Sequence, residues 1–223
     1  MQRKHLYALL YLFVIFIILF YSFVYFTNKD STIDINYSII SEISDYNEID
    51  QHYREAVKES INYFTLDSMK KFNAKKPLIR IDAIKLFDKI GRENIKSYGN
   101  TTSELPYFND FNSNDAHTNS IKSLTSHISK KKDFPSYNDI LGYEIKKSEP
   151  MTRLEFVLLL SSFLEPKNVG HTYKDVPDKF KKQVATVNAY GIIQTSDNLM
   201  ANDPVTREQA ALMIHRFNQS VGK

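Results

Sequence analysis

A short pattern of apolar and polar residues occurs three times along the chain and ends each time in a helical periodicity. The copies run from Pro77 to Asp82, from Pro150 to Glu155 and from Pro204 to Gln209, and each reads proline, apolar residue, threonine or isoleucine, arginine, any residue, acid or amide. The third, sixth, seventh and tenth residues after each arginine are apolar in every copy: Ala83, Leu86, Phe87 and Ile90; Phe156, Leu159, Leu160 and Phe163; Ala210, Met213, Ile214 and Phe217. This spacing places them on one face of a helix. We therefore expect three amphipathic helices that begin near Arg80, Arg153 and Arg207.

Two of these expected helices carry a recognisable start signal. Thr152 and Thr206 stand directly before the arginines, and Glu155 and Gln209 follow three residues later. In a capping box the threonine side chain accepts from the third helical amide while the acid or amide reaches back to the threonine N–H. The first copy has Ile79 at this position, and it cannot cap the helix in this way.

An apolar residue followed two positions later by aspartate lies upstream of each motif. The three pairs are Ile43 and Asp45, Phe108 and Asp110, and Tyr173 and Asp175. Another helical stretch follows each pair, and Gly191 is placed to close the third such helix in a left-handed conformation. Each block thus reads as helix, loop, helix. We expect Asp175 to be a cap or turn residue, with a ligand-binding role as the alternative.

The N-terminal part of the chain has a different pattern. Residues from Leu6 to Phe26 include no charged side chain, and Arg3 and Lys4 precede them. Such a helix is about 31 Å long, which matches the roughly 30 Å hydrocarbon core of a bilayer. The positive-inside rule then leaves the N-terminus in the cytoplasm and exports the rest. The alternative is a cleaved secretory signal, although the apolar run is long for one.

These patterns predict a mainly all-α chain with five segments. They are a cytoplasmic stub and transmembrane helix (1–26), a stalk (27–42) and three repeated blocks (43–91, 105–164 and 171–218). Residues 91–103 and 165–171, rich in small polar residues or containing proline and glycine, separate the blocks as linkers.

Composition removes several function classes. The chain has 29 Lys and Arg against 26 Asp and Glu, and two of the basic residues precede the apolar segment, so the exported part is nearly neutral and nucleic-acid binding is not expected. There is no cysteine, and the six glycines are too scattered for a P-loop or a dinucleotide fingerprint. No histidine spacing suggests a metal site. We expect no enzymatic activity, cofactor or metal, and we interpret the run Lys130 to Lys132 as solvated surface, with a specific anion site as the alternative.

The third block resembles the S-layer homology repeat. The similarity rests on Tyr173-x-Asp-Val-Pro-x-x-Phe180, on Gly191-Ile-Ile193 and on Asn202-Asp-Pro-Val-Thr-Arg-Glu-Gln209. It extends more weakly over residues 43–218, with the first two blocks degenerate. The resemblance implies a pseudo-threefold helical bundle with grooves between neighbouring repeats. It also implies binding of a pyruvylated secondary cell-wall polysaccharide, whose acidic ketal the motif arginine contacts.

Carried over by motif position, the resemblance gives a set of candidate glycan-binding residues: Arg80, Arg153, Arg207, Thr152, Thr206, Asp110, Asp175 and Phe180. The chain has no tryptophan, although the first helix of the family often carries one, and its turns have few glycines. We therefore expect one or two working grooves. By chemistry alone, each arginine could instead clamp a neighbouring repeat through an acidic residue.

The expected partners follow from these interpretations. They are the pyruvylated polysaccharide, with peptidoglycan as a further candidate, and the cell membrane through Leu6 to Phe26. The expected location is the cell membrane, with a single pass and the repeats facing the wall. The competing hypothesis is a membrane-anchored scaffold that binds another envelope protein and has no affinity for glycan.

Overall fold

The structure is a computed structural model that describes Ile17 and residues 40–96, 98–99, 108–111, 114–167 and 171–222. It divides into two units, Met1–Ser44 and Asp45–Lys223, and the second holds nearly all of the described residues. The predicted membrane segment, Leu6 to Phe26, lies outside the described residues apart from Ile17, as does most of the predicted stalk. Of the helices that the structure describes, none has the length and apolar character needed to cross a membrane.

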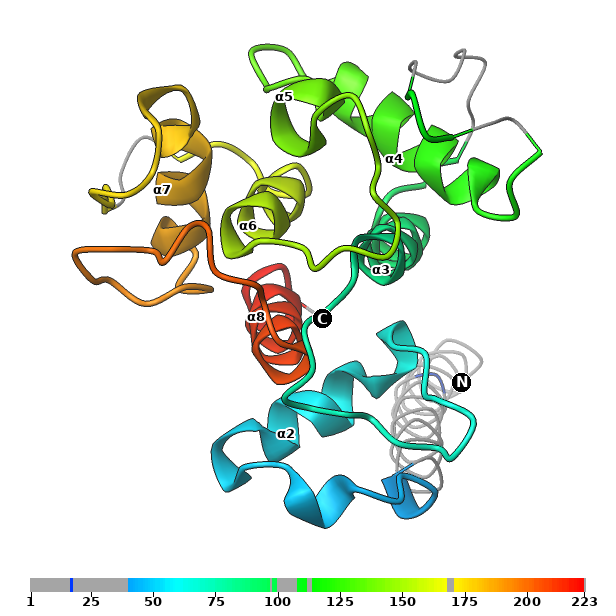
Figure 1. Cartoon of the computed structure of the whole chain (residues 1–223). Helices are drawn as coiled ribbons and strands as arrows, with labels where there is room; N and C mark the ends of the chain where they lie inside the picture. Colours follow the sequence, from blue (N-terminus) through cyan, green and yellow to red (C-terminus); the bar gives the residue numbers. More distant parts are fainter. Residues whose placement is uncertain are drawn as a thin grey trace, which may run out of the picture. The chain divides into compact units, whose positions relative to one another are not determined.

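The second unit is helical, which confirms the predicted mainly all-α class. Its described part contains seven α-helices and no strand (Figure 1). The helices are α2 (Gln51–Ser60), α3 (Arg80–Asn94), α4 (Thr118–Ser129), α5 (Tyr137–Leu141), α6 (Arg153–Ser161), α7 (Lys181–Ala189) and α8 (Arg207–Ser220). Short 3₁₀ helices span Tyr46–Glu48 (η1), Ile61–Tyr63 (η2) and Asp178–Phe180 (η3).

Helices α3, α6 and α8 begin at the three motif arginines, as the sequence predicts. Complete capping boxes start α6 and α8, formed by Thr152 with Glu155 and by Thr206 with Gln209. Ile79 makes no side-chain cap at α3. Eleven of the twelve predicted apolar positions are buried, and Phe163, which follows the end of α6, is partly buried.

The helices pair between successive blocks. The second helix of one block packs against the first helix of the next, α3 against α4 and α6 against α7. Helix α8 of the last block packs against α2 of the first, so the arrangement closes into a ring. Figure 1 shows α3, α6 and α8 in the middle, with α2, α4 and α7 outside them.

The motif loops join at the centre of this ring. The N–H of Leu78 donates to the carbonyl of Val205 (2.8 Å), that of Met151 to Leu78 (2.8 Å) and that of Val205 to Met151 (3.0 Å). All three residues are buried. Each loop therefore donates one bond to one neighbour and accepts one from the other, so the three loops form a closed cycle of hydrogen bonds.

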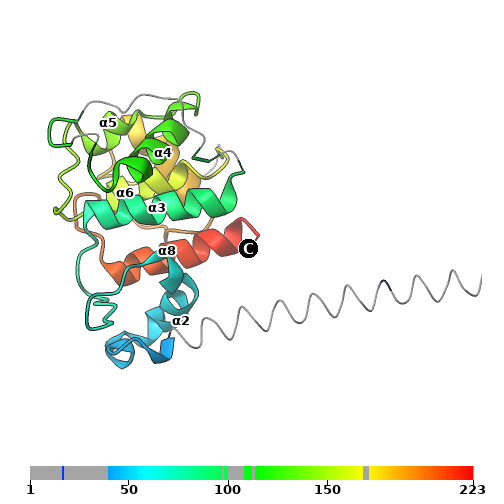
Figure 2. The same ribbon diagram turned by 90° about the vertical axis from the view of Figure 1, so that its right-hand side faces the viewer.

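Two features differ from the sequence expectation. Helix α3 continues to Asn94, into the first four residues of the expected linker. At Gly91 the ring of Tyr98 lies so close that a Cβ atom would come within 2.2 Å of it. Glycine within a helix lowers its stability by about 1 kcal/mol relative to alanine. Here the absence of a side chain leaves space for the ring of Tyr98. Helix α5 is an addition to the second block that the sequence did not indicate; Ser136 and Asp139 cap it, and it packs against α4 and α6 (Figure 2).

Candidate functional site

One aspartate, buried at Asp45, half-buried at Asp175 and exposed at Asp110, holds the loop before each motif. Both of its carboxylate oxygens accept backbone N–H groups of that loop, at 2.7 to 2.8 Å. The bonds run to Asp45 from Phe72 and Asn73, to Asp110 from Ile145 and Lys146, and to Asp175 from Leu199 and Ala201. Each loop also contains a residue in the left-handed region, namely Asn73 (φ 55°), Lys146 (φ 51°) and Met200 (φ 58°). Asp110 and Asp175 thus shape loops, and they do not cap the helix that follows them in sequence.

The motif arginines lie at the boundaries between blocks. The backbone N–H of Arg80 donates to the backbone carbonyl of Glu149 (2.9 Å), that of Arg153 to the carbonyl of Asp203 (2.8 Å) and that of Arg207 to the carbonyl of Lys76 (3.0 Å). Each arginine side chain then contacts the loop of the neighbouring block. We call these the first (Arg80), second (Arg153) and third (Arg207) sites. They have the same backbone hydrogen bonds and differ in the partners of the arginine side chain.

At the first site, a carboxylate neutralises Arg80. Its Nη2 forms an ion pair with Glu155, and its Nη1 donates to the carbonyl of Leu141 (3.1 Å). The side chains are only 10% and 12% exposed. Burial raises the pKa of Glu155, while hydrogen bonding to Thr152 and the charge of Arg80 oppose this rise. Glu155 is also the capping residue of α6. Its carboxylate therefore both caps this helix and binds the arginine of the preceding block.

At the third site, Arg207 is enclosed. Its Nε donates to the carbonyl of Phe72 (2.6 Å) and its Nη2 to that of Thr65 (2.7 Å). The guanidinium carbon lies 5.4 Å and 5.0 Å from the ring centroids of Phe64 and Phe72. Burial lowers the pKa of Arg207. Asp82, at the position of Glu155, is one methylene shorter and pairs with Lys85 (3.2 Å).

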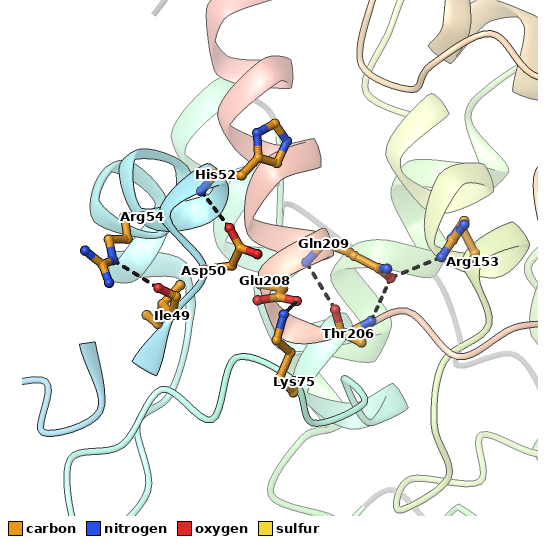
Figure 3. A network of polar contacts seen from close by, with 9 residues as sticks. All are labelled: Ile49, Asp50, His52, Arg54, Lys75, Arg153, Thr206, Glu208 and Gln209. Atoms are coloured by element: carbon orange, nitrogen blue, oxygen red, sulfur yellow. Dashed lines mark hydrogen bonds and ion pairs between the residues drawn. The ribbon is translucent and has the colours of Figure 1, made fainter. Parts of the chain in front are cut away.

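At the second site, the partner of Arg153 is neutral. Its Nη1 donates to the carbonyl of Leu199 and its Nη2 to Oε1 of Gln209, both at 3.2 Å. The same Gln209 oxygen accepts the N–H of Thr206 (3.2 Å), so Thr206, Gln209 and Arg153 are linked as Figure 3 shows. Among the described residues, no carboxylate lies within ion-pair distance of Arg153. Its positive charge is therefore uncompensated by a direct partner.

Arg153 lines a groove of about 260 Å³ to which all three blocks contribute. Arg216 of α8 supplies a second guanidinium, one N–H of which donates to the carbonyl of Ile192 (3.1 Å). Tyr53 and Tyr173 supply aromatic rings, and Gln209 supplies an amide. Of the described residues that line the groove, none is aspartate or glutamate. Two cations, aromatic rings and amides without an opposing carboxylate suit an anionic ligand that also carries hydroxyl groups.

The groove unites few of the residues proposed from the motif. Arg153 lines the groove, whereas Thr152 and Thr206 cap helices α6 and α8 and do not line it. Phe180 is buried in the hydrophobic core and borders a different cleft. Sequence reasoning missed Arg216 and His52 as groove residues, because they enter through the packing of α8 on α2, which no local pattern indicates.

Among the described residues, no group of three or more His, Cys, Asp or Glu side chains is placed to hold a metal ion. Comparison of the chain with models of protein families and with curated proteins found no match.

Proposed function

We propose that this chain is an S-layer-homology-like protein that attaches non-covalently to the cell wall by binding an anionic, pyruvylated polysaccharide in the Arg153 groove. The observation that carries the proposal is that Arg153 and Arg216 both line a groove of about 260 Å³ that has no acidic residue among its described lining residues. A carboxylate ligand would find there two guanidinium groups and no competing carboxylate.

The arrangement of the blocks supports the same proposal. Three motif loops joined by a closed set of hydrogen bonds, and boundaries that each hold one arginine, match the architecture that the sequence resemblance implies. In this interpretation residues 43–91, 105–164 and 171–218 are the repeats. Residues 1–26 anchor the chain in the membrane with a single pass, and the repeats face the wall polysaccharide, with peptidoglycan as a further ligand. The chain acts by binding and not by catalysis.

The three sites are proposed to contribute unequally. Arg80 already forms an ion pair with the carboxylate of Glu155, and Arg207 donates to two carbonyls beside two phenylalanine rings that contact each other. At Arg153 two N–H groups are engaged by Leu199 and Gln209, and the remaining ones are available to a ligand. Binding should therefore depend mainly on Arg153, although the third block has the closest resemblance to the family.

The test is co-sedimentation of the full chain, purified in a mild detergent, with protein-free cell-wall sacculi. We expect Arg153→Ala to weaken binding about tenfold, which corresponds to roughly 1.4 kcal/mol. Gln209→Glu should have a similar effect without loss of thermal stability, because it would give Arg153 the internal carboxylate that Glu155 gives Arg80. Arg92→Ala, which removes an exposed arginine on α3, is the matched control and should bind as wild type does.

Removal of pyruvate from the sacculi should release the wild-type chain, and raised salt should weaken its binding. Sedimentation that survives both pyruvate removal and Arg153→Ala would reject the proposal. The hypothesis of a membrane-anchored scaffold for another envelope protein would then take its place.

A further inference from the structure

The addition to the second block forms one wall of a second cleft. Two adjoining cavities of about 240 Å³ and 50 Å³ lie between residues 131–139 and helix α7. They share Asp133, Phe134 and Gln183. The residues that line them are different from those that line the Arg153 groove. The other two blocks have no helix equivalent to α5 among the described residues, so this cleft lies outside the threefold pattern.

Among the described residues that line this cleft, Gln183 has a buried polar atom without a hydrogen-bond partner. It projects from α7, is 8% exposed, and its Oε1 is buried without a hydrogen-bond partner among the described residues. An unpaired buried polar group costs about 1 to 3 kcal/mol. Because Gln183 lines both cavities, a ligand in the cleft that shifts this side chain could supply the missing donor.

The walls of the cleft are apolar and its rim is mainly basic. Phe134, Leu164 and Pro166 contribute apolar surface. The ionisable residues that line the two cavities are Lys131, Lys132, Lys179 and Lys182, with Asp133 and Asp139. Lys131 donates to the carbonyl of Leu164 (3.3 Å), and Lys179 lies 3.7 Å from Asp139. Four ammonium groups against two carboxylates leave the rim with an excess of positive charge.

We propose that this cleft binds an acidic peptide segment of another protein, anchored by one apolar side chain. An extended peptide offers an N–H to Oε1 of Gln183 and a carbonyl to its side-chain N–H group, which is the pairing that a buried amide can complete. The apolar walls receive the anchor side chain, and the lysines attract flanking acidic residues. A peptide is favoured over a polysaccharide because it can offer an apolar side chain, beside its acidic groups, to the apolar surface that Phe134, Leu164 and Pro166 contribute to the smaller cavity. The proposal is independent of glycan binding at Arg153.

The experiment is a fluorescence-anisotropy titration of a labelled peptide with the full chain in mild detergent. The peptide has capped ends and one central phenylalanine, and aspartates occupy every second position on both sides of it. The wild-type chain should bind this peptide, and should bind it at least fivefold more weakly when alanine replaces the phenylalanine or lysines replace the aspartates. Lys132→Ala with Lys182→Ala should weaken binding at least fivefold. Lys76→Ala with Lys96→Ala, which removes the same charge at exposed positions elsewhere, should leave it unchanged.

A separate variant distinguishes binding from folding. Gln183→Leu removes the unpaired amide, so its melting temperature should equal or exceed that of wild type, while its affinity for the peptide should fall at least fivefold. The proposal is overturned if the wild-type chain does not bind the peptide with a Kd of about 1 mM or tighter. It is also overturned if Lys132→Ala with Lys182→Ala leaves the affinity unchanged, as the control pair is expected to do. Competition by purified wall polysaccharide that depends on Lys132 and Lys182 would assign the cleft to a glycan and also overturn it.

Discussion

One aspartate in each block fixes a loop that lies far along the chain. The residues that it joins are between 24 and 36 positions apart, and both carboxylate oxygens are used in each case. A residue in the left-handed region, which is uncommon for residues other than glycine, lies in each loop: Asn73, Lys146 and Met200. The carboxylate therefore offsets the conformational cost of a turn that presents the motif loop to its neighbours.

Replacement of Asp175 by asparagine tests this role. Asparagine keeps one acceptor and places an N–H₂ group against a backbone donor, so unfolding free energy should fall by about 1 to 3 kcal/mol. Burial opposes the ionisation of Asp175, but the backbone N–H groups of Ala201 and Leu199 stabilise its charge, and its pKa is lowered. The stability that Asp175 contributes is therefore present above its ordinary pKa near 3.9 and is lost as pH falls through the lowered value.

Urea denaturation of both proteins at neutral pH and near pH 3 provides the measurement. The difference between wild type and Asp175→Asn should shrink at the acidic pH. A constant difference across this range would show that the charge of Asp175 does not stabilise the loop.

At the scale of the helices, a single side chain often has two partners. Glu155 caps α6 and pairs with Arg80, and Gln209 caps α8 and accepts from Arg153. The side chains of Glu155 and Gln209 thus each cap a helix and bind the arginine of the preceding block. At Arg80 and Arg153 these partners offset the helix dipole, which makes a cation in the first helical turn unfavourable by a few tenths to 1 kcal/mol.

Thr152→Ala should measure the cap at α6. The variant loses the bond from the N–H of Glu155 to Oγ1 of Thr152 (3.3 Å), and we expect unfolding free energy to fall by about 1 kcal/mol. Thr152→Ser retains the acceptor and serves as the control. Equal stability of all three proteins in thermal denaturation would contradict the assignment.

Local patterns in the sequence predict the helix starts and their buried faces well, because caps and apolar periodicity act within a few residues. They do not predict the extension of α3 past Gly91, where the ring of Tyr98 lies against the helix, or the addition of α5. The groove was predicted only through its arginine. Its other cation, Arg216, and its aromatic wall at Tyr53 are brought together by the packing of α2 on α8, which joins opposite ends of the described chain.

For the whole molecule, the central set of hydrogen bonds predicts cooperative opening. The N–H groups of Leu78, Met151 and Val205 each bond to a different loop of the set, so opening one loop removes a partner from both of its neighbours. In native-state hydrogen exchange, these three amides should be among the slowest and should share one opening free energy close to that of global unfolding. Markedly unequal values would show that the blocks open separately.

The contact between α2 and α8, which closes the ring, differs mechanically from the other two helix pairs. The contacts of α3 with α4 and of α6 with α7 are each made by helices that follow one another directly along the chain, whereas α2 and α8 are the first and last helices of the ring. A pull on the segment before Asp45 enters the ring at that aspartate, where it is resisted by the two hydrogen bonds to Phe72 and Asn73. The load then passes to the face between α2 and α8, which also shapes the Arg153 groove. Tension on the N-terminal side of the chain would thus be transmitted to the groove through a joint that is held by side-chain packing and by the contact between Glu59 of α2 and His215 of α8.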